Sequence, residues 1–338
     1  MSLAVRKPVS TQKSPHFRFW TDENSSLEQH PIPPLTSHPV LFNKVAILGM
    51  GLLGGSLGKA LRRRGLASCV AGYARRHETV QACLALDAAH VASTDPLEVV
   101  QEADLVVLCT PVCQMAELAR LTLPHLSPNA VVTDVGSTKA AIVSELEPLF
   151  AKRGISFVGG HPMAGSDQSG VAASKEDLYV NARCVVTPTD RSPGAAVNRI
   201  RQLWEAVGGR VQLASPKDHD LWAARASHLP HLLASSLAHY TLDPLQPEGV
   251  RELCATGFRD TTRLANGSPE MWRDIALTNR DEIRLAIQAW TADLAALDSA
   301  LADASPSSIE RYLQEAKERR EAWLRGFRPN GSDNGSIA

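Results

Sequence analysis

The stretch VAILGMGLLGGS, residues 45–56, decides the fold of this chain. Its first four residues form an apolar run that ends at glycines, which is the pattern of a buried parallel strand. Residues 49–54 read G-x-G-x-x-G, and Ser56–Arg64 has the pattern of a helix. Between strand and helix, such glycines allow a tight turn, close approach of a pyrophosphate and close packing. The stretch predicts a dinucleotide-binding loop, with these cofactor-binding residues: Gly49, Gly51, Leu52, Leu53 and Gly54.

Further apolar runs, mostly separated by helical patterns, predict an α/β fold with a doubly wound parallel sheet. The runs are Cys69–Tyr73, Leu105–Thr110, Ala130–Val135, Ile155–Val158 and about Cys184–Thr187, the last of which is expected to close the domain. Long helical patterns then predict an all-helical C-terminal domain: Ala195–Val207, Pro216–Tyr240, Met271–Leu297 and Ile309–Leu324. We therefore expect a tail at 1–43, a nucleotide-binding domain at 44–190, a helical domain at 191–325 and a disordered tail at 326–338.

The composition is that of an ordinary globular protein. The 338 residues are 44% hydrophobic and 21% charged, enough chain for two domains with sizeable cores. The net charge of −1 excludes a globally basic nucleic-acid binder, and no apolar run reaches the ~18 residues of a membrane helix. Six scattered cysteines without a C-x-x-C pair favour neither a disulfide framework nor a metal site.

The first 43 residues are rich in proline and show no steady period, which is typical of a flexible tail. Basic residues precede the first acid, Asp22. An ordinary tail on a cytoplasmic protein is the favoured interpretation. The acid-free start is also typical of a transit peptide to a plastid or another organelle.

The end of the second predicted strand indicates which dinucleotide binds. An acidic residue about 20 positions after the glycines would bind the adenosine ribose of NAD. Ala74 stands there instead, followed by Arg75 and Arg76. Two guanidinium groups pair well with a 2′-phosphate, so the sequence favours NADP. The alternative is that both arginines are surface charges and that NAD also binds.

Two polar motifs follow predicted strands, where open α/β sheets bind their ligands. The first is Asp134–Lys139, and the second is Gly159–Ser166 with His161 and Pro162 between glycines. A histidine before proline is expected on a rigid exposed turn, and we interpret His161 as functional.

A third polar group lies in the helical half. His228 and His231 are three residues apart and can share one helix face, which Pro230 is expected to kink. The segment Gly257–Arg263 adds arginines further along. A zinc pair is imaginable, but recognition of a carboxylate by the arginines, with neutral histidines as donors, fits the pattern better.

Taken together, these motifs resemble the prephenate/arogenate dehydrogenases of tyrosine biosynthesis. The motifs run in family order from about Val45 to Arg325, and they are the Gly49–Ser56 loop, Leu108–Pro111, Asp134–Lys139, Gly160–Gly165, Ser227–His231 and Gly257–Thr262. The resemblance implies a Rossmann domain followed by a helical dimerisation domain, and hence a homodimer. It also implies an NAD(P)-dependent oxidoreductase that acts on a CH–CH donor with decarboxylation.

The resemblance further implies a role for each motif residue. His161 takes the proton of the substrate hydroxyl, Ser137 orients that hydroxyl, and Thr110 and Pro111 join the cofactor site. Arg259 binds a substrate carboxylate with help from His228 or His231. The residues that follow the His161 turn, Ser166 and Asp167, are expected substrate contacts.

The substrate is prephenate or arogenate, with oxidation of prephenate to 4-hydroxyphenylpyruvate as the preferred interpretation. An acid such as Asp167 beside the substrate side chain would favour arogenate, and so would an NADP preference. His231 favours prephenate, because the resemblance implies that some NADP-linked arogenate enzymes lack it.

Two rivals share the architecture. A β-hydroxyacid or imine reductase would be expected to carry a catalytic lysine or a different polar set in place of His161 with Arg259. A non-catalytic NADP-binding regulatory protein would need only the glycine loop. The dimer also has an alternative, because the apolar faces of the C-terminal helices could pack within one subunit.

Overall fold

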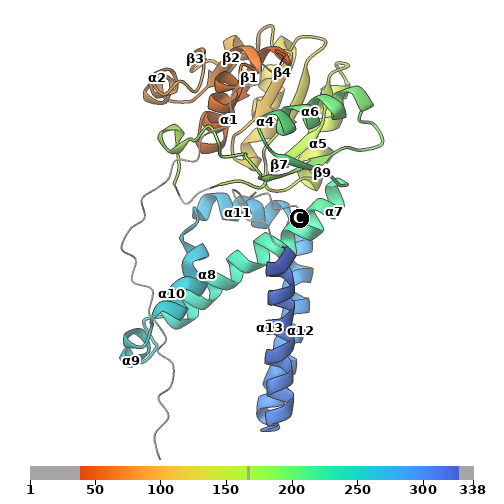
Figure 1. Cartoon of the computed structure of the whole chain (residues 1–338). Helices are drawn as coiled ribbons and strands as arrows, with labels where there is room; N and C mark the ends of the chain where they lie inside the picture. The colour runs from red at the N-terminus through yellow and green to blue at the C-terminus, as the bar shows by residue number, and fades with distance from the viewer. Residues whose placement is uncertain (1–38, 166–167, 327–338) are drawn as a thin grey trace, which may run out of the picture. The chain divides into compact units, whose positions relative to one another are not determined.

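Strand β1 (Phe42–Leu48) lies inside a parallel sheet, with β2 on one side and β4 on the other. The computed structural model describes residues 39–165 and 168–326, and within them this sheet has six strands in the order β3-β2-β1-β4-β5-β6. All its pairs are parallel, and the strand order reverses direction next to β1. The other strands are β2 (Ala67–Tyr73), β3 (Val91–Ser93), β4 (Leu105–Leu108), β5 (Val131–Asp134) and β6 (Ser156–Phe157). The predicted doubly wound sheet is confirmed (Figure 1).

Alternate side chains of β1 enter two different cores. Val45 and Ile47 pack with apolar residues of α1 (Leu52–Arg63) and α6 (Gly194–Ala206). Ala46 and Leu48 pack with those of the helices on the opposite face. Successive strand residues point to opposite faces of a sheet, so a continuous apolar run is what a strand covered on both sides requires. The remaining helices of this part are α2 (His77–Ala85), α3 (Pro96–Val100), α4 (Val112–Thr122) and α5 (Ala140–Ala151).

A second sheet corrects two expectations. Within the described ranges it has three strands, ordered β7 (Gly159–Pro162), β8 (Arg183–Thr187) and β9 (Arg210–Leu213). The predicted last strand exists as β8, but it pairs antiparallel with β7 and parallel with β9, outside the large sheet. The expected exposed turn around His161 was wrong: His161 lies in β7 with 8% of its surface exposed. Glycines permit this burial, because a Cβ at Gly160 would lie 2.9 Å from the Asp134 carbonyl oxygen.

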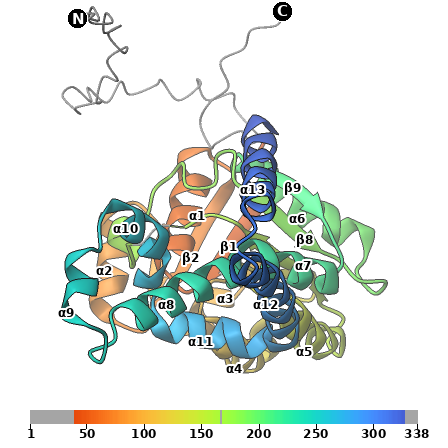
Figure 2. The same ribbon diagram turned by 90° about the horizontal axis from the view of Figure 1, so that it is seen from below.

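The C-terminal part is mostly helical, as expected (Figure 2). The predicted helix from Pro216 is confirmed but contains a π-helical segment, and the predicted helix from Met271 is interrupted. The predicted helix from Pro216 is α7 (Pro216–Ala223), a π-helical segment and then α8 (Leu229–Thr241). Pro230 has no N–H to donate to the preceding turn. The π-helical segment Ala224–His228 forms that turn and accommodates the missing helical hydrogen bond. The predicted helix from Met271 breaks at Asn279 into α11 (Pro269–Thr278) and α12 (Arg280–Ala302). The shorter elements are α9 (Glu248–Glu252), α10 (Thr256–Thr262) and a 3₁₀ turn (Arg263–Asn266).

Helix α13 (Pro306–Gly326) packs beside α12, and Tyr312 Oη donates to Asp293 Oδ2 at 2.6 Å. Of the two predicted tails, 1–43 and 326–338, residues 1–38 and 327–338 lie outside the described residues. Their inner bounds were wrong, because residues 42 and 43 belong to β1 and Gly326 belongs to α13. None of the helices in the described part of the chain is both long and apolar enough to cross a membrane.

Candidate active site

The glycine loop between β1 and α1 has a backbone that side chains would disrupt. Gly49 has a φ of +118°, and a Cβ there would lie 2.7 Å from the carbonyl carbon of Cys109. A Cβ at Gly54 would lie 2.1 Å from the Gly49 carbonyl oxygen. Gly51 differs, because a Cβ there would meet nothing within 4 Å. Its backbone therefore faces open space, where a ligand can approach.

The N-terminus of α1 suits an anion. Its N-cap residue is Gly51, which has no side chain to cap the helix, and its first turn holds no acidic residue. The first N–H groups of the helix, including those of Leu52 and Leu53, have no intrahelical partner. Together with the helix dipole they attract a phosphate group.

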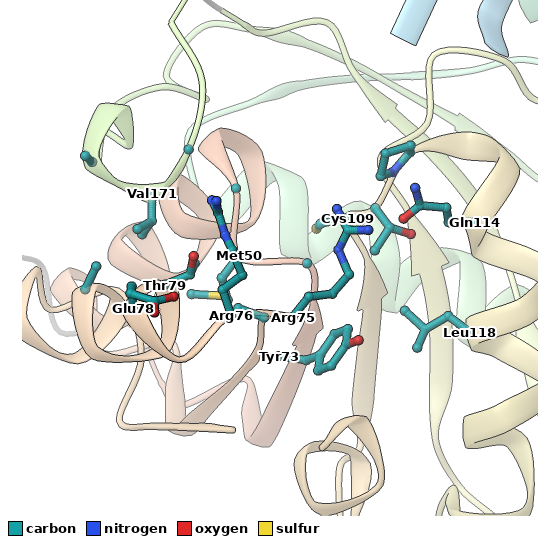
Figure 3. A pocket seen from close by; sticks show the side chains of 18 of the residues that line it. Met50, Tyr73, Arg75, Arg76, Glu78, Thr79, Cys109, Gln114, Leu118 and Val171 are labelled. Atoms are coloured by element: carbon teal, nitrogen blue, oxygen red, sulfur yellow. The ribbon is translucent and has the colours of Figure 1, made fainter. Parts of the chain in front are cut away.

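A cavity of about 960 Å³ opens beside this loop (Figure 3). Its walls include all three regions predicted to hold the cofactor: the glycine loop with Gly49 and Gly51, the end of β2 with Arg75 and Arg76, and the loop after β4 with Thr110 and Pro111. The Thr110 hydroxyl is buried and has no partner within the described ranges, as expected of a donor that awaits a ligand. The volume, the open helix end and this hydroxyl all fit a dinucleotide.

A buried ion pair fixes the backbone of the residue that precedes His161 on β7. Lys139 Nζ contacts the Asp134 carboxylate and donates to the Gly160 carbonyl oxygen at 2.8 Å. Asp134 Oδ1 also accepts from the Gly160 N–H at 3.0 Å. The backbone just before His161 is therefore fixed on both its N–H and its carbonyl side. Burial, followed by the neighbouring His219, Lys139 and His228, holds the pKa of His161 well below its usual value, so the imidazole is neutral near pH 7.

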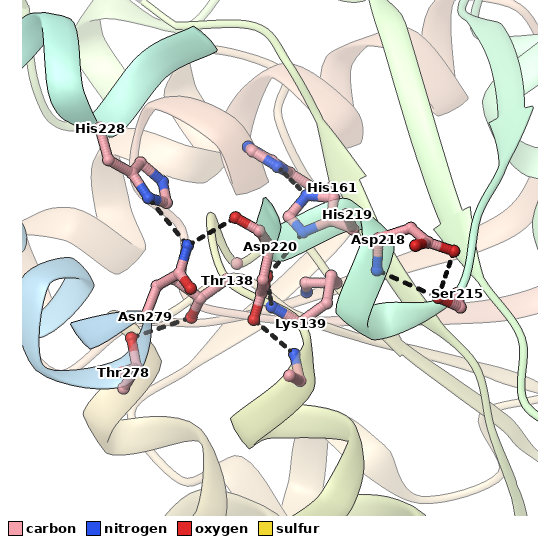
Figure 4. Close-up of polar contacts among 12 residues, drawn as sticks. Thr138, Lys139, His161, Ser215, Asp218, His219, Asp220, His228, Thr278 and Asn279 are labelled. Atoms are coloured by element: carbon pink, nitrogen blue, oxygen red, sulfur yellow. Dashed lines mark hydrogen bonds and ion pairs between the residues drawn. The ribbon is translucent and has the colours of Figure 1, made fainter. Parts of the chain in front are cut away.

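Two residues that the sequence analysis missed complete this cluster (Figure 4). His219 Nε2 lies 2.8 Å from His161 Nδ1, and His219 Nδ1 lies 2.8 Å from Asp220 Oδ1. Asp220 also accepts from the backbone N–H groups of Lys139 and Ala140 at the start of α5, at 2.7 and 2.8 Å. Both residues lie in the middle of the short helix α7, and the adjacent His-Asp pair was the only sequence signal for them.

The imidazole of His228 makes hydrogen bonds within the protein, to a side chain and to the backbone. Its Nδ1 lies 3.1 Å from Asn279 Nδ2, which also donates to the Asp220 carbonyl oxygen at 2.9 Å. The ring makes a further hydrogen bond with the Ser137 backbone. Burial lowers the pKa of His228 to about 4, so this imidazole too is neutral near pH 7. Ser137, which is half-buried, is thus anchored by a helix of the C-terminal part.

The other predicted substrate residues differ in their burial and are not all in contact with one another. His231 is buried and stacks on Trp272, with ring centroids 3.5 Å apart, and Trp272 also meets His228 edge-on at 6.0 Å. Arg259 on α10 is 74% exposed, and its Nε donates to Asp260 Oδ1 at 3.0 Å. In the described part of the chain no hydrogen bond joins Arg259 to the histidines. Ser166 and Asp167 lie outside the described residues.

The nucleotide cavity and the histidine cluster lie at neighbouring strand ends. Leu108, the last residue of β4, pairs with Asp134, the last residue of β5. Thr110, in the cavity wall, follows the first of these strands, and Ser137 follows the second. A neutral imidazole beside a dinucleotide site can take a proton from an alcohol while its carbon loses a hydride.

Comparisons with known proteins agree with this architecture. The model for the prephenate dehydrogenase nucleotide-binding domain matches residues 57–213, and that for the dimerization domain matches residues 215–315. Prephenate dehydrogenase of Bacillus subtilis (strain 168) is 35% identical over 82% of this chain and 75% of its own length.

Two solved structures have the same fold over 83% of this chain. Prephenate dehydrogenase from A. aeolicus, in complex with hydroxyphenyl propionate and NAD+, is 34% identical, with a TM-score of 0.78 over 98% of that chain. Synechocystis arogenate dehydrogenase is 31% identical, with a TM-score of 0.73 over 99% of that chain. The resemblance of the motifs is confirmed, and the chain belongs to the prephenate dehydrogenase family of NAD(P)-dependent oxidoreductases.

Proposed function

We propose that the chain oxidises and decarboxylates prephenate to 4-hydroxyphenylpyruvate, with NADP as the preferred hydride acceptor. The observation that carries this proposal is the buried, neutral His161. The residue before it, Gly160, is bound by Asp134 at the end of β5, and the neighbouring strand β4 leads into the wall of the nucleotide cavity. Relatives named for prephenate and for arogenate both align over most of the chain, so the family alone does not select the substrate.

In the proposed mechanism, His161 takes the proton of the substrate ring hydroxyl, and the half-buried Ser137 orients that hydroxyl. The bound nicotinamide supplies the acceptor for the hydride from the same ring carbon. Loss of the ring carboxylate as CO₂ leaves its electron pair in the ring, which becomes aromatic, and the resulting phenolate oxygen takes back the proton from His161 to give the product hydroxyl. Because aromatisation drives the reaction, the protein has only to bind, orient and deprotonate the substrate.

The remaining substrate contacts are proposed from their positions in the chain. His231 lies on α8 close to His228, and α10, which carries Arg259, packs against the same helix. We assign Arg259 to a substrate carboxylate and His231 to a neutral donor beside it. His228 is assigned to the same side of the site, where it holds the backbone of Ser137. Ser166 and Asp167, four residues or more beyond Pro162 in sequence, are proposed to meet the substrate side chain.

The preference for NADP rests on the wall of the cavity at the end of β2. Arg75 and Arg76 both line it, and Ala74 leaves no carboxylate at the strand end itself. Glu78 lines the cavity one position into α2, as Figure 3 shows. Two guanidinium groups outweigh this single carboxylate for a 2′-phosphate, and paired hydrogen bonds suit its oxygens.

A homodimer is proposed from the match to the dimerization-domain model and from the apolar side chains exposed on the last two helices. On α12 and α13 they are Leu285, Ile287, Trp290, Leu294, Leu301, Leu313, Trp323 and Leu324. An exposed apolar face of this kind is typical of a buried interface. Light scattering after gel filtration should give twice the mass of one chain.

The test crosses prephenate and arogenate with NAD and NADP and follows absorbance of the reduced nicotinamide. The proposal expects the highest kcat/KM for prephenate with NADP, and a clear preference for arogenate would replace the substrate. His161→Asn should lower kcat about 10²–10⁴-fold if His161 is the general base. No reduction of either cofactor with either substrate would overturn the proposed function.

A further inference from the structure

A chain of hydrogen bonds leads from His161 to a carboxylate on another element. It runs from His161 on β7 through His219 to Asp220, both on α7 (Figure 4). The exposed fractions of these residues are 8%, 3% and 2%, so bulk water does not compete for their hydrogen bonds. The two imidazole rings meet edge to face, with centroids 5.0 Å apart.

The surroundings of Asp220 determine where the protons lie. Its carboxylate accepts from two backbone N–H groups at the N-terminus of α5, where the helix dipole favours a negative charge. An ionised carboxylate can only accept, so Nδ1 of His219 must donate to it. A neutral His219 then has a bare Nε2, which can only accept.

The same reasoning passes on to His161. Because His219 Nε2 accepts, the proton between the two rings belongs to His161 Nδ1. The neutral His161 is then left with a bare Nε2, the nitrogen available to a substrate. If Asp220 did not hold the proton of His219 on Nδ1, His219 could donate from Nε2 and reverse the arrangement. His161 would then carry its proton on Nε2 and could not act as a base there.

We propose that His219 and Asp220 are positioning residues that hold His161 in the tautomer with a bare Nε2. This inference rests on the proposed role of His161 as the group that takes the substrate proton. These hydrogen bonds also stabilise His161 after it has taken the substrate proton. The imidazolium keeps its Nδ1–H bonded to His219, and the carboxylate of Asp220, on the far side of His219, balances the positive charge.

Other titratable groups near His161 oppose its protonation. Lys139, which precedes α5, and the histidines His219 and His228 all disfavour a positive charge on this ring. The Lys139 charge is countered by Asp134 at the end of β5. Asp220 is joined to His161 through His219, so it is the carboxylate positioned to stabilise the imidazolium.

The test compares three substitutions at His219 and Asp220. His219→Leu leaves His161 Nδ1 without an acceptor, and we expect kcat to fall about 10²–10³-fold because general-base catalysis is lost. His219→Gln can still present an oxygen to that nitrogen, so kcat should stay within about tenfold of wild type. Asp220→Asn should resemble His219→Leu, and in all three variants the KM for the nucleotide should be unchanged.

The pH profile separates positioning from a merely structural role. The acid limb of kcat/KM should move to a different pH in Asp220→Asn, since the charge behind the imidazolium is gone. The matched control is Ser215→Ala, which removes the side-chain cap of the same helix, a 3.0 Å bond to the Asp218 N–H, without touching the histidines. It should lower stability by about 1 kcal/mol and leave the pH profile unchanged.

Two results would overturn the proposal. One is wild-type kcat in His219→Leu, provided that His161→Asn is inactive. The other is an equal loss of kcat in His219→Gln and His219→Leu, together with an acid limb of kcat/KM in Asp220→Asn at the same pH as in wild type. Failure of the proposed function looks different, because the wild-type enzyme itself would then reduce no cofactor with either substrate.

Discussion

Lys139 and Asp134 form an ion pair in which neither side chain has any exposed surface. Burial lowers the pKa of Lys139, and the carboxylates of Asp134 and Asp220 partly offset this effect. Such a pair is costly to break, because either partner alone would be a buried charge without compensation. Here the pair also holds the backbone of Gly160, the residue before His161, at both its N–H and its carbonyl group.

Lys139→Met should therefore lower the free energy of unfolding by about 3–5 kcal/mol, since it leaves the Asp134 carboxylate buried without its cation. Urea unfolding measures this change. Lys152→Met, at an exposed position at the end of α5, is the matched control and should change stability little. Adding Asp134→Asn to Lys139→Met should restore part of the loss. Equal stabilities of the two methionine variants would contradict this account of the pair.

The arginines at the end of β2 give a prediction about the cofactor. Arg75→Ala and Arg76→Ala should each lower kcat/KM for NADP roughly 10–100-fold, because hydrogen bonds to a charged group contribute about 1.5–3 kcal/mol. The values for NAD should change little, since NAD lacks the 2′-phosphate. Arg153→Ala, at an exposed position away from the cavity walls, is the control. A parallel fall for both nucleotides would show that the arginines bind a part common to both.

Local pattern was enough to predict the parallel sheet and the nucleotide loop. The apolar run in β1 and the glycines at 49, 51 and 54 lie within one strand–turn–helix unit, so short-range rules apply to them. The second sheet was not predictable in this way. Strand β7 is only Gly159–Pro162, and its pairing partner β8 begins at Arg183. A glycine-rich segment with a proline is typical of a turn, and only the distant partner makes it a strand.

The histidine cluster has the same dependence on distant contacts. His161 and His219 are 58 residues apart, and Asp220 lies 80 residues from the Ala140 N–H that it accepts from. His161 was identified because a motif surrounds it. Apart from its adjacency to His219, nothing in the pattern around residues 216–223 distinguishes Asp220 from an ordinary helix charge such as Asp218. The interrupted helix at Asn279 is similar, because its side chain bonds to Asp220 and His228 rather than to its own helix.

Buried neutral histidines make the stability of the protein depend on pH. Burial lowers the pKa of His228 to about 4, while an unfolded histidine titrates near its ordinary value of about 6.5. Between these values the unfolded chain binds more protons, so stability falls as the pH falls through this window. From about pH 7 to about pH 5 this residue alone should remove about 2 kcal/mol, and His161 acts in the same direction.

Carboxylates also titrate in this range, so a comparison of variants isolates the histidine. In His228→Gln the free energy of unfolding should fall less between these two pH values than in wild type, by about 2 kcal/mol. His125→Gln, at an exposed position, should keep the wild-type dependence. Identical pH dependence in wild type and His228→Gln would mean that His228 is not held neutral by burial.

Gly267 offers the sharpest test of the substrate side of the site. A Cβ at this position would lie 2.5 Å from Trp272 Nε1 and 2.7 Å from His231 Cε1. These two rings stack with 10° between their planes, so neither can move without disturbing the other. Gly267→Ala should therefore displace His231 and raise the KM for prephenate about tenfold or more. The added methyl group should also lower the free energy of unfolding by about 1–3 kcal/mol, because the site becomes overpacked.

The KM for the nucleotide should not change in Gly267→Ala, because the cavity beside the glycine loop has no wall formed by His231 or Trp272. Gly249→Ala is the matched control: a Cβ there meets nothing within 4 Å, and the substitution adds the same methyl group on the surface of α9. Steady-state kinetics with each substrate varied in turn separates the two KM values. If Gly267→Ala loses stability but keeps the substrate KM of Gly249→Ala, His231 does not contact the substrate and its stacking on Trp272 only supports the fold.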